Sequence, residues 1–168
     1  MVRSLRFLLL LTLVVLASSQ TSRAETVRVP ATGEPAFAFD APSGWMIIYD
    51  QYGNAEFVAN DHASTMQLMI ITDAGAMSTT EMAVSFFQAA DASPYSRTGS
   101  GTIAGYTADV FYSDLVIDDT HLNMAIMIHK IDDSHVAILS TTTKADILPA
   151  QTSALEALTA SVRLTGVK

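Results

Sequence analysis

The sequence predicts an α+β fold in which a mainly antiparallel central β-sheet is flanked by helices, an α-β-α sandwich. Two apolar runs, His121–Ile131 and His135–Thr143, are joined by the short polar turn Asp132-Asp133-Ser134, which is the pattern of a β-hairpin. The first run is apolar on both faces, so the hairpin needs cover on both sides. Two amphipathic helical segments elsewhere in the chain can supply that cover. The two faces of the first run are Leu122, Met124, Ile126 and Ile128 on one side and Ala125, Met127 and Ile131 on the other.

Residues 1–24 read as a cleavable signal peptide rather than as part of the fold. Arg3 and Arg6 precede the apolar run Phe7–Ala17, and Ser22-Arg23-Ala24 is a small-x-small cleavage site. That run is shorter than the roughly 20 residues that span a bilayer. We therefore expect cleavage after Ala24, a periplasmic or secreted protein, and no integral membrane segment.

Composition excludes several classes of protein. The chain has no cysteine, which excludes disulfide scaffolds, lipoproteins, thiolate metal sites and cysteine nucleophiles. Removing the signal leaves 144 residues with six basic against seventeen acidic side chains, a net charge of −11. Such a surface repels phosphate backbones, so we expect no nucleic-acid partner.

The first half of the mature chain predicts a lead-in followed by strands. Residues 25–36 contain Pro30, Gly33 and Pro35, which favour an irregular segment over a regular element. Four strands separated by turns follow, at Phe37–Phe39, Trp45–Tyr49, Ala55–Ala59 and Thr65–Thr72.

A helix is then indicated by the capping box Ser78-Thr-Thr-Glu81. Its apolar face consists of Met82, Ala83, Phe86, Phe87 and Ala90, and it ends at Ser93-Pro94. Beyond it, residues 95–105 hold three glycines and predict a weak strand or a mobile connection. Tyr106–Leu115 is again a strand, and Asp118-Asp119-Thr120 turns into the central hairpin.

The chain ends in a second amphipathic helix. Asp146 is the expected N-cap, and Pro149 lies in the first turn, where its missing N–H costs little. Arg163 lies near the negative pole of the helix. Residues 37–168 therefore form one predicted domain. The stripe of this helix is Leu148, Gln151, Leu155, Leu158 and Val162.

The motif Phe37-x-Phe39-x-x-Pro42-x-Gly44-Trp45 resembles the opening of the PsbP-like family. The element order and the helix end Ala160-Ser-Val-Arg163 are similar too, so the resemblance covers 37–164. The family shares its α-β-α sandwich with the Ran-binding nuclear import factor and with bacterial families of unknown function. The resemblance implies a non-catalytic fold that binds, stabilises or assembles other proteins. The signal is of the Sec type rather than plastid, no residue matches a known functional position, and a role in photosystem assembly is not carried over.

Three groups of residues are candidates for chemical sites. His121, His129 and His135 lie near aspartates, and His129 and His135 could share a face of the hairpin, but the spacing is not that of a zinc site. The pairs Met66/Met69 and Met124/Met127 resemble copper(I) ligands, yet residues three apart on a strand point to opposite faces, which favours core packing. Gly99-x-Gly101-x-x-x-Gly105 lacks the dinucleotide spacing and is interpreted as a flexible turn.

No catalytic, cofactor-binding or metal-ligating residue is assigned from the sequence, and no cofactor is expected. There is no Gly-x-Ser-x-Gly elbow and no Ser-x-x-Lys, although a triad assembled only in three dimensions stays an open alternative. Trp45 is interpreted as a core residue at a turn rather than an exposed anchor.

The preferred function is an exported, non-catalytic accessory protein. It would bind or stabilise a protein partner in the cell envelope through a sheet edge or the groove beside the helices. The alternative is a periplasmic carrier of a small apolar ligand, held by adaptable methionines. An enzyme of unrecognised type is the second alternative.

Overall fold

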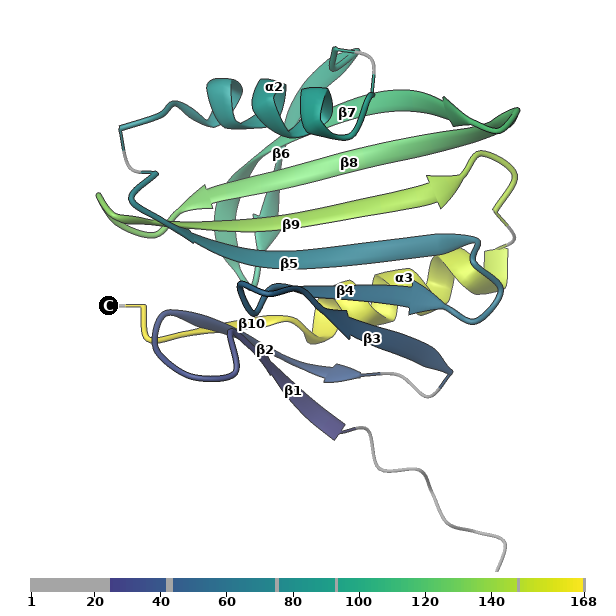
Figure 1. Cartoon of the computed structure of the whole chain (residues 1–168). Coiled ribbons are helices and arrows are strands. Elements are labelled where there is room, and N and C mark those ends of the chain that lie inside the picture. Colours follow the sequence, from purple (N-terminus) through teal and green to yellow (C-terminus); the bar gives the residue numbers. More distant parts are fainter. Residues whose placement is uncertain (1–24, 42–43, 75, 93, 148, 168) are drawn as a thin grey trace, which may run out of the picture.

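A computed structural model of the 168-residue chain describes residues 25–41, 44–74, 76–92, 94–147 and 149–167 (Figure 1). The predicted signal peptide, residues 1–24, lies outside the described residues. The larger sheet is antiparallel, with its strands in the order β3-β4-β5-β9-β8-β7-β6. Their bounds are β3 Trp45–Tyr49, β4 Ala55–Ala59, β5 Ser64–Thr72, β6 Arg97–Ile103, β7 Tyr106–Ile117, β8 Thr120–Lys130 and β9 His135–Lys144.

The helices are α2 (Thr79–Ala89) and α3 (Pro149–Ser161). A second, smaller antiparallel sheet has the order β1-β2-β10. Its strands are β1 (Glu25–Val29), β2 (Ala36–Ala41) and β10 (Arg163–Thr165). The predicted α+β class with a mainly antiparallel sheet is therefore confirmed.

The predicted hairpin is formed by β8 and β9 in the middle of the larger sheet. Ile128 lies opposite Ile138 in its register. At the turn, Asp132 Oδ1 accepts hydrogen bonds from the backbone N–H groups of Ser134 and His135, both at 2.7 Å. The aspartate thus supplies the acceptor that a tight turn needs, which is the local reason the two apolar runs fold back on each other.

Alternate residues of the central strands enter two separate cores, one on each face of the sheet. On β9, Ala137 and Leu139 pack into one core, whereas Val136 and Ile138 pack into the other. α3 and the small sheet lie on the first face, which we call the α3 face. α2 lies on the second, the α2 face (Figure 1). The prediction that the middle strands are buried on both sides by helices on opposite faces is confirmed.

α2 begins where the capping box predicts. The Ser78 hydroxyl accepts a hydrogen bond from the N–H of Glu81 at 3.2 Å, and the Glu81 carboxylate accepts one from the N–H of Ser78 at 2.8 Å. Met82, Ala83 and Phe87 are buried against the sheet. α2 contacts β7 and β8 and leaves the β3 end of its face open.

The terminal helix is confirmed, with changes at both ends. Asp146 lies in a turn ahead of Pro149, not at the N-cap position, and the predicted stripe residue Leu148 lies outside the described residues. Leu158 and Val162 are buried in the core of the α3 face. Arg163 belongs to β10 rather than to the helix, and its guanidinium forms an ion pair with Asp40 at 3.2 Å.

Two further expectations are corrected. Glu25–Val29 is not a loose lead-in but the strand β1, which pairs with β2. Of the two alternatives for residues 95–105 the strand is confirmed, as β6, but Gly99 and Gly101 lie within this strand rather than in the flexible turn expected for them. Pairing with β7 along the whole of β6 outweighs the low strand propensity of glycine.

Candidate functional site

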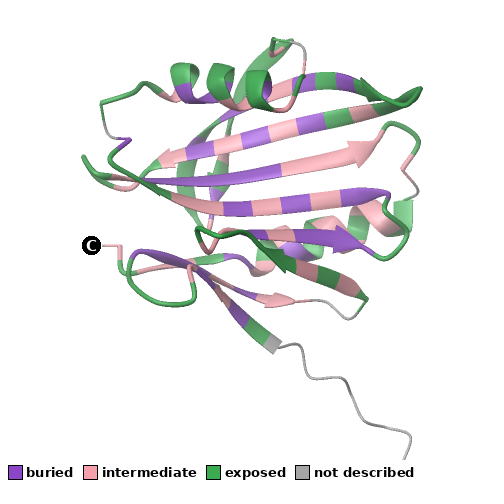
Figure 2. Cartoon of the chain, in the orientation of Figure 1, coloured by how far each residue is buried: buried purple, intermediate pink, exposed green. Residues whose placement is uncertain are grey.

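β3 exposes apolar side chains at one edge of the larger sheet. This strand is first in the strand order, so one side of its backbone has no strand partner among the described residues. Met46 and Ile48 point to the α2 face with 49% and 44% of their surface exposed. Ile71 of β5 shares that face and is exposed too. We call Met46 and Ile48 the β3 patch. Figure 2 shows β3 largely exposed, in contrast to the alternating burial of β5.

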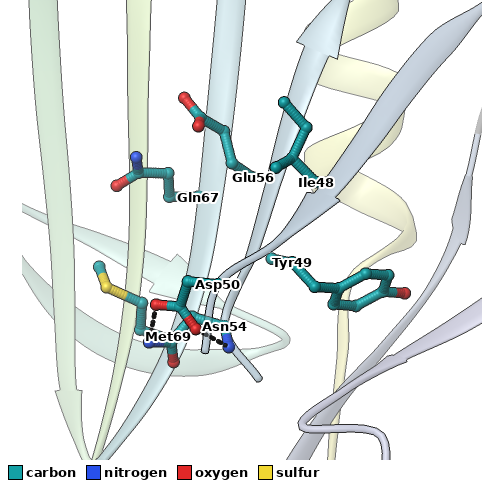
Figure 3. Close-up of a pocket in the computed structure, with 8 residues that line it drawn as sticks. Ile48, Tyr49, Asp50, Asn54, Glu56, Gln67 and Met69 are labelled. Carbon is teal, nitrogen blue, oxygen red and sulfur yellow. Dashed lines mark hydrogen bonds between the residues drawn. The ribbon is translucent and has the colours of Figure 1, made fainter. Parts of the chain in front are cut away.

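A small pocket of about 150 Å³ lies beside the β3 patch (Figure 3). β3, β4 and β5 position its side chains, and the turn between β3 and β4 closes one end. Its walls are apolar where Ile48, Ala55 and Met69 contribute, whereas Glu56 and Gln67 place polar groups at one end. Figure 3 shows the Asp50–Asn54 turn at the other end and the ring of Tyr49 pointing away.

The turn at the end of the pocket holds an ionised carboxylate. The side-chain amide of Asn54 donates to Asp50 Oδ2 at 2.8 Å, and the backbone N–H groups of Asn54 and Tyr52 donate to Oδ1 at 2.9 and 2.8 Å. The Asn54 side-chain bond is the main cause that lowers the pKa of Asp50 below its usual value, and the backbone donors lower it further. Asp50 therefore stays negatively charged down to acidic pH.

Glu56 supplies the second charge of the pocket. It lies opposite Ile48 in the β3–β4 register and opposite Gln67 in the β4–β5 register, and it is half-buried. The residues lining the pocket include two carboxylates and no basic side chain. The site therefore combines apolar walls with uncompensated negative charge.

A second hollow, the α3 groove, runs between α3 and the β6–β8 part of the α3 face. It consists of two adjoining cavities of about 490 and 500 Å³ that share Thr141 and Leu155. Its walls mix apolar and hydroxyl side chains, with Arg97, Asp114 and Asn123 at one end. The walls of the groove also include Thr102, Met127, Thr159 and Val162.

The three histidines that lie near aspartates in the sequence make different contacts in the structure. His129 stacks on Tyr106 with ring centroids 5.1 Å apart, and its Nδ1 is 2.9 Å from the carbonyl oxygen of Thr107. His135 is bound to Asp132, and His121 is exposed at the start of β8. His129 and His135 do share a face of the hairpin. Among the described residues, no three histidine or carboxylate side chains gather as a metal site.

The methionines follow the strand geometry that the sequence predicts. Met66 and Met127 pack in the core of the α3 face, whereas Met69 and Met124 pack in that of the α2 face. The members of each pair three residues apart therefore point to opposite sides of the sheet. Trp45 is partly buried against the core of the α3 face, as expected.

Sequence reasoning did not identify Glu56 or Asp50 as site residues. Glu56 is the only charged residue within the strand Ala55–Ala59, which is the one signal that could have pointed to it. Asp50 looked like an ordinary turn residue, and it does fix the turn. Its second role follows from the position of β3 at the sheet edge, which strand patterning does not reveal.

Comparison with known proteins gives fold matches only. No protein-family model matches the chain, and no curated protein matches it in sequence. The structure matches LpqN of Mycobacterium tuberculosis, described as involved in cell envelope biogenesis, with a TM-score of 0.56 at 10% identity. That match covers 84% of this chain and 91% of LpqN.

Two other solved structures match over most of the chain. Cyanobacterial PsbP from Synechocystis matches with a TM-score of 0.56 at 11% identity, covering 87% of this chain and 96% of that one. The Ran-binding protein Mog1p of Saccharomyces cerevisiae matches with a TM-score of 0.52 at 9% identity, covering 84% and 96%. None of the described helices is long and apolar enough to cross a membrane. The strand order, the two helices on opposite faces and these matches together show that the protein has the PsbP/Mog1-like fold.

Proposed function

We propose that the protein is an exported, non-catalytic accessory protein that binds a protein partner in the cell envelope. The partner adds an extended segment to the free edge of β3. The observation that carries this proposal is the exposure of Met46 and Ile48 on an edge strand without a charged residue. Exposed apolar edge strands are templates for pairing, and proteins that do not use them usually protect them with charges, proline or a cover.

Strand addition would use both the unpaired backbone of β3 and the pocket beside Ile48. The unpaired backbone groups of β3 supply main-chain hydrogen bonds to an added strand, and the pocket beside Ile48 supplies side-chain selectivity. The opposite edge, β6, offers a different surface. It contains Gly99 and Gly101, and its one charged residue, Arg97, stacks over Tyr112 at 4.1 Å. β3 is therefore the edge better suited to an apolar partner segment.

The fold matches support this class of function. Mog1p is a Ran-binding protein, so the fold can serve protein binding, and LpqN is described as involved in cell envelope biogenesis. A comparable envelope role for this chain is part of the proposal. It accords with the signal peptide expected at residues 1–24.

Site-specific photocrosslinking in the producing cell tests the proposal. p-Benzoylphenylalanine at position 46 should give an adduct with a defined protein, and the same probe at Val116 should not. Val116 is a matched control because it is exposed and lies in β7, which four strands separate from β3. Hydrogen exchange of the purified complex should then show slower exchange at the amides of β3. Equal adducts at both positions, or no protection at β3, would refute docking at this edge.

Export is tested separately by the mass of the protein recovered from the cell envelope. The proposal requires a chain that begins at Glu25 and is found outside the cytoplasm. A full-length chain retained in the cytoplasm would contradict it, whatever the crosslinking result.

A carrier of a small ligand is the second candidate function, and the α3 groove favours it. The two adjoining cavities are large, and Met127, Leu155 and Val162 give them an apolar side. The threonine hydroxyls of the groove mean that the ligand would need polar groups as well as apolar ones. Native mass spectrometry of protein from its own host should show the bound mass, and Leu155→Trp should remove it. Val84→Trp, at an exposed position on α2, is the control.

A further inference from the structure

The chemistry of the β3 pocket narrows the kind of partner segment that fits. Its walls at Ile48, Ala55 and Met69 are apolar, and its polar ends are Glu56 and Asp50. A long side chain with an apolar stem and a cationic head matches this arrangement, because lysine and arginine lay their stems on apolar surface and keep the charged head in a polar site.

Charge also decides between a foreign partner and a second copy of this chain. Self-pairing of β3 about Ile47 would set Met46 against Ile48 of the copy. Neither copy would supply the pocket of the other with a basic group, because β3 contains no lysine or arginine. The whole chain is also acidic, with a net charge of −8, so two copies repel each other. A basic segment is attracted by the same charges.

The sheet geometry places the basic side chain. A residue opposite Ile48 on an added strand points to the α2 face, and Glu56 lies opposite Ile48 on the other side. The added residue and Glu56 are then two strand spacings apart, about 10 Å between Cα atoms. The stem of a lysine or arginine crosses Ile48 and brings its head toward the Glu56 carboxylate, with Gln67 as a neighbouring hydrogen-bonding group.

We propose that the partner of β3 is an extended apolar segment carrying a lysine or arginine, whose head binds Glu56 in the β3 pocket. This inference rests on the proposed strand addition and specifies what it recognises. Glu56 sets the charge requirement, the apolar patch accepts the flanking residues, and Asp50 adds negative charge at the other end of the pocket.

Two synthetic peptides test the inference in solution. The probes are acetyl-Val-Thr-Lys-Thr-Val-amide, in which both valines share the face of the lysine, and the same peptide with norleucine in place of lysine. They are titrated into the ¹⁵N-labelled protein in the form that the cell produces, and binding is followed by the amide shifts of residues 46–49, 55–57 and 67–69. The lysine peptide should bind about two- to fivefold tighter at low salt, the range for one partly exposed ion pair, and this advantage should shrink as salt is added.

Variants assign the effect to one carboxylate. Glu56→Gln should abolish the preference for lysine while leaving the norleucine peptide unaffected. Glu156→Gln is the matched control, because it removes the same charge from an exposed position on α3 and should leave the preference intact.

Each outcome separates this inference from the proposed function. Equal binding of both peptides at β3 overturns the basic-head requirement and leaves strand addition standing. Shifts at β3 that depend on protein concentration without peptide identify a second copy as the occupant and overturn both. Peptides that leave the β3 amides unchanged also overturn both.

Discussion

Replacing Phe57 with alanine tests the packing that holds β4, and with it Glu56, in place. Phe57 is fully buried in the core of the α3 face, directly beside Glu56 in sequence. Its ring packs edge-on against Phe39 of the small sheet, with centroids 4.6 Å apart and planes at 85°. Truncation of a buried phenylalanine costs about 3–5 kcal/mol. We expect Phe57→Ala to lower the free energy of unfolding by that amount, a large share of the roughly 5–15 kcal/mol typical of a domain.

The contribution of the ring pair is measured with milder changes. Phe39→Leu, Phe57→Leu and the double variant form a thermodynamic cycle, in which the aromatic contact should appear as a coupling of about 0.5–1.5 kcal/mol. The leucine variants also give a result if the alanine variant does not fold. Urea unfolding followed by fluorescence of Trp45, the single tryptophan, is the assay. Tyr52→Ala is the control, because Tyr52 is 77% exposed and its loss should change stability by less than about 0.5 kcal/mol. A cost below 1 kcal/mol for Phe57→Ala, or a coupling near zero, would refute this account of the core.

Three further predictions follow from local geometry. Ser78→Ala removes the cap of α2 and should cost about 1 kcal/mol in urea unfolding, because the N–H of Glu81 loses its acceptor. Gly166→Ala should cost about 1–2 kcal/mol, because φ is +72° there and a Cβ would meet the side chain of Glu34. The third prediction concerns Asp132, whose pKa is lowered by hydrogen bonds from backbone N–H groups. Its charged form therefore stabilises the fold above about pH 4, and this stability is lost as the pH falls through the lowered pKa. Asp132→Asn should therefore make the urea midpoint less dependent on pH between about 5 and 2.

Specific results would contradict each of these. Ser78→Thr should retain most of the cap, so an equal loss for both substitutions would indicate another cause. The cost of Gly166→Ala should fall when Glu34→Gly is added, because this change also removes the Glu34 Cβ that the new Cβ would meet, and an unchanged cost would mean that backbone strain alone is responsible. An unaltered pH profile for Asp132→Asn would show that this carboxylate does not govern acid sensitivity.

Elements whose sequence signals lie within a few neighbouring residues could be predicted from the sequence. The capping box at Ser78 set the start of α2, and the Asp132 turn between two apolar runs set the central hairpin. The double-sided apolar pattern of β8 correctly placed that hairpin between two helical layers. Each of these features depends on residues a few positions apart, whose physical preferences do not need the rest of the fold.

Elements formed by distant pairing were missed. β1 looked irregular because prolines follow it, and β10 looked like the end of a helix because Arg163 suits a helix C-terminus. Both become strands by pairing with β2, a partner that local pattern does not specify.

The candidate site was out of reach for a related reason. The sequence Trp45–Tyr49 is typical of any apolar strand, and no residue in it indicates that the strand will lie at the edge of the sheet. That position follows only from the order in which all seven strands of the sheet pair. The mixed character of the α3 groove likewise depends on Leu155 of α3 and Thr141 of β9 meeting in space.

The small sheet has a kinetic consequence. β2 pairs on one side with β1, which is close in sequence, and on the other with β10, where Arg163 lies opposite Ala38. The chain from Ala38 to Arg163 must close into one long loop before β2 and β10 can pair. Such pairing between distant residues raises the contact order, and two-state domains dominated by it fold in milliseconds to seconds rather than microseconds. Until that loop closes, the flank of the α3 face that includes Phe57 has only part of its cover, so a newly made chain is most open to aggregation and proteolysis before its last strand docks.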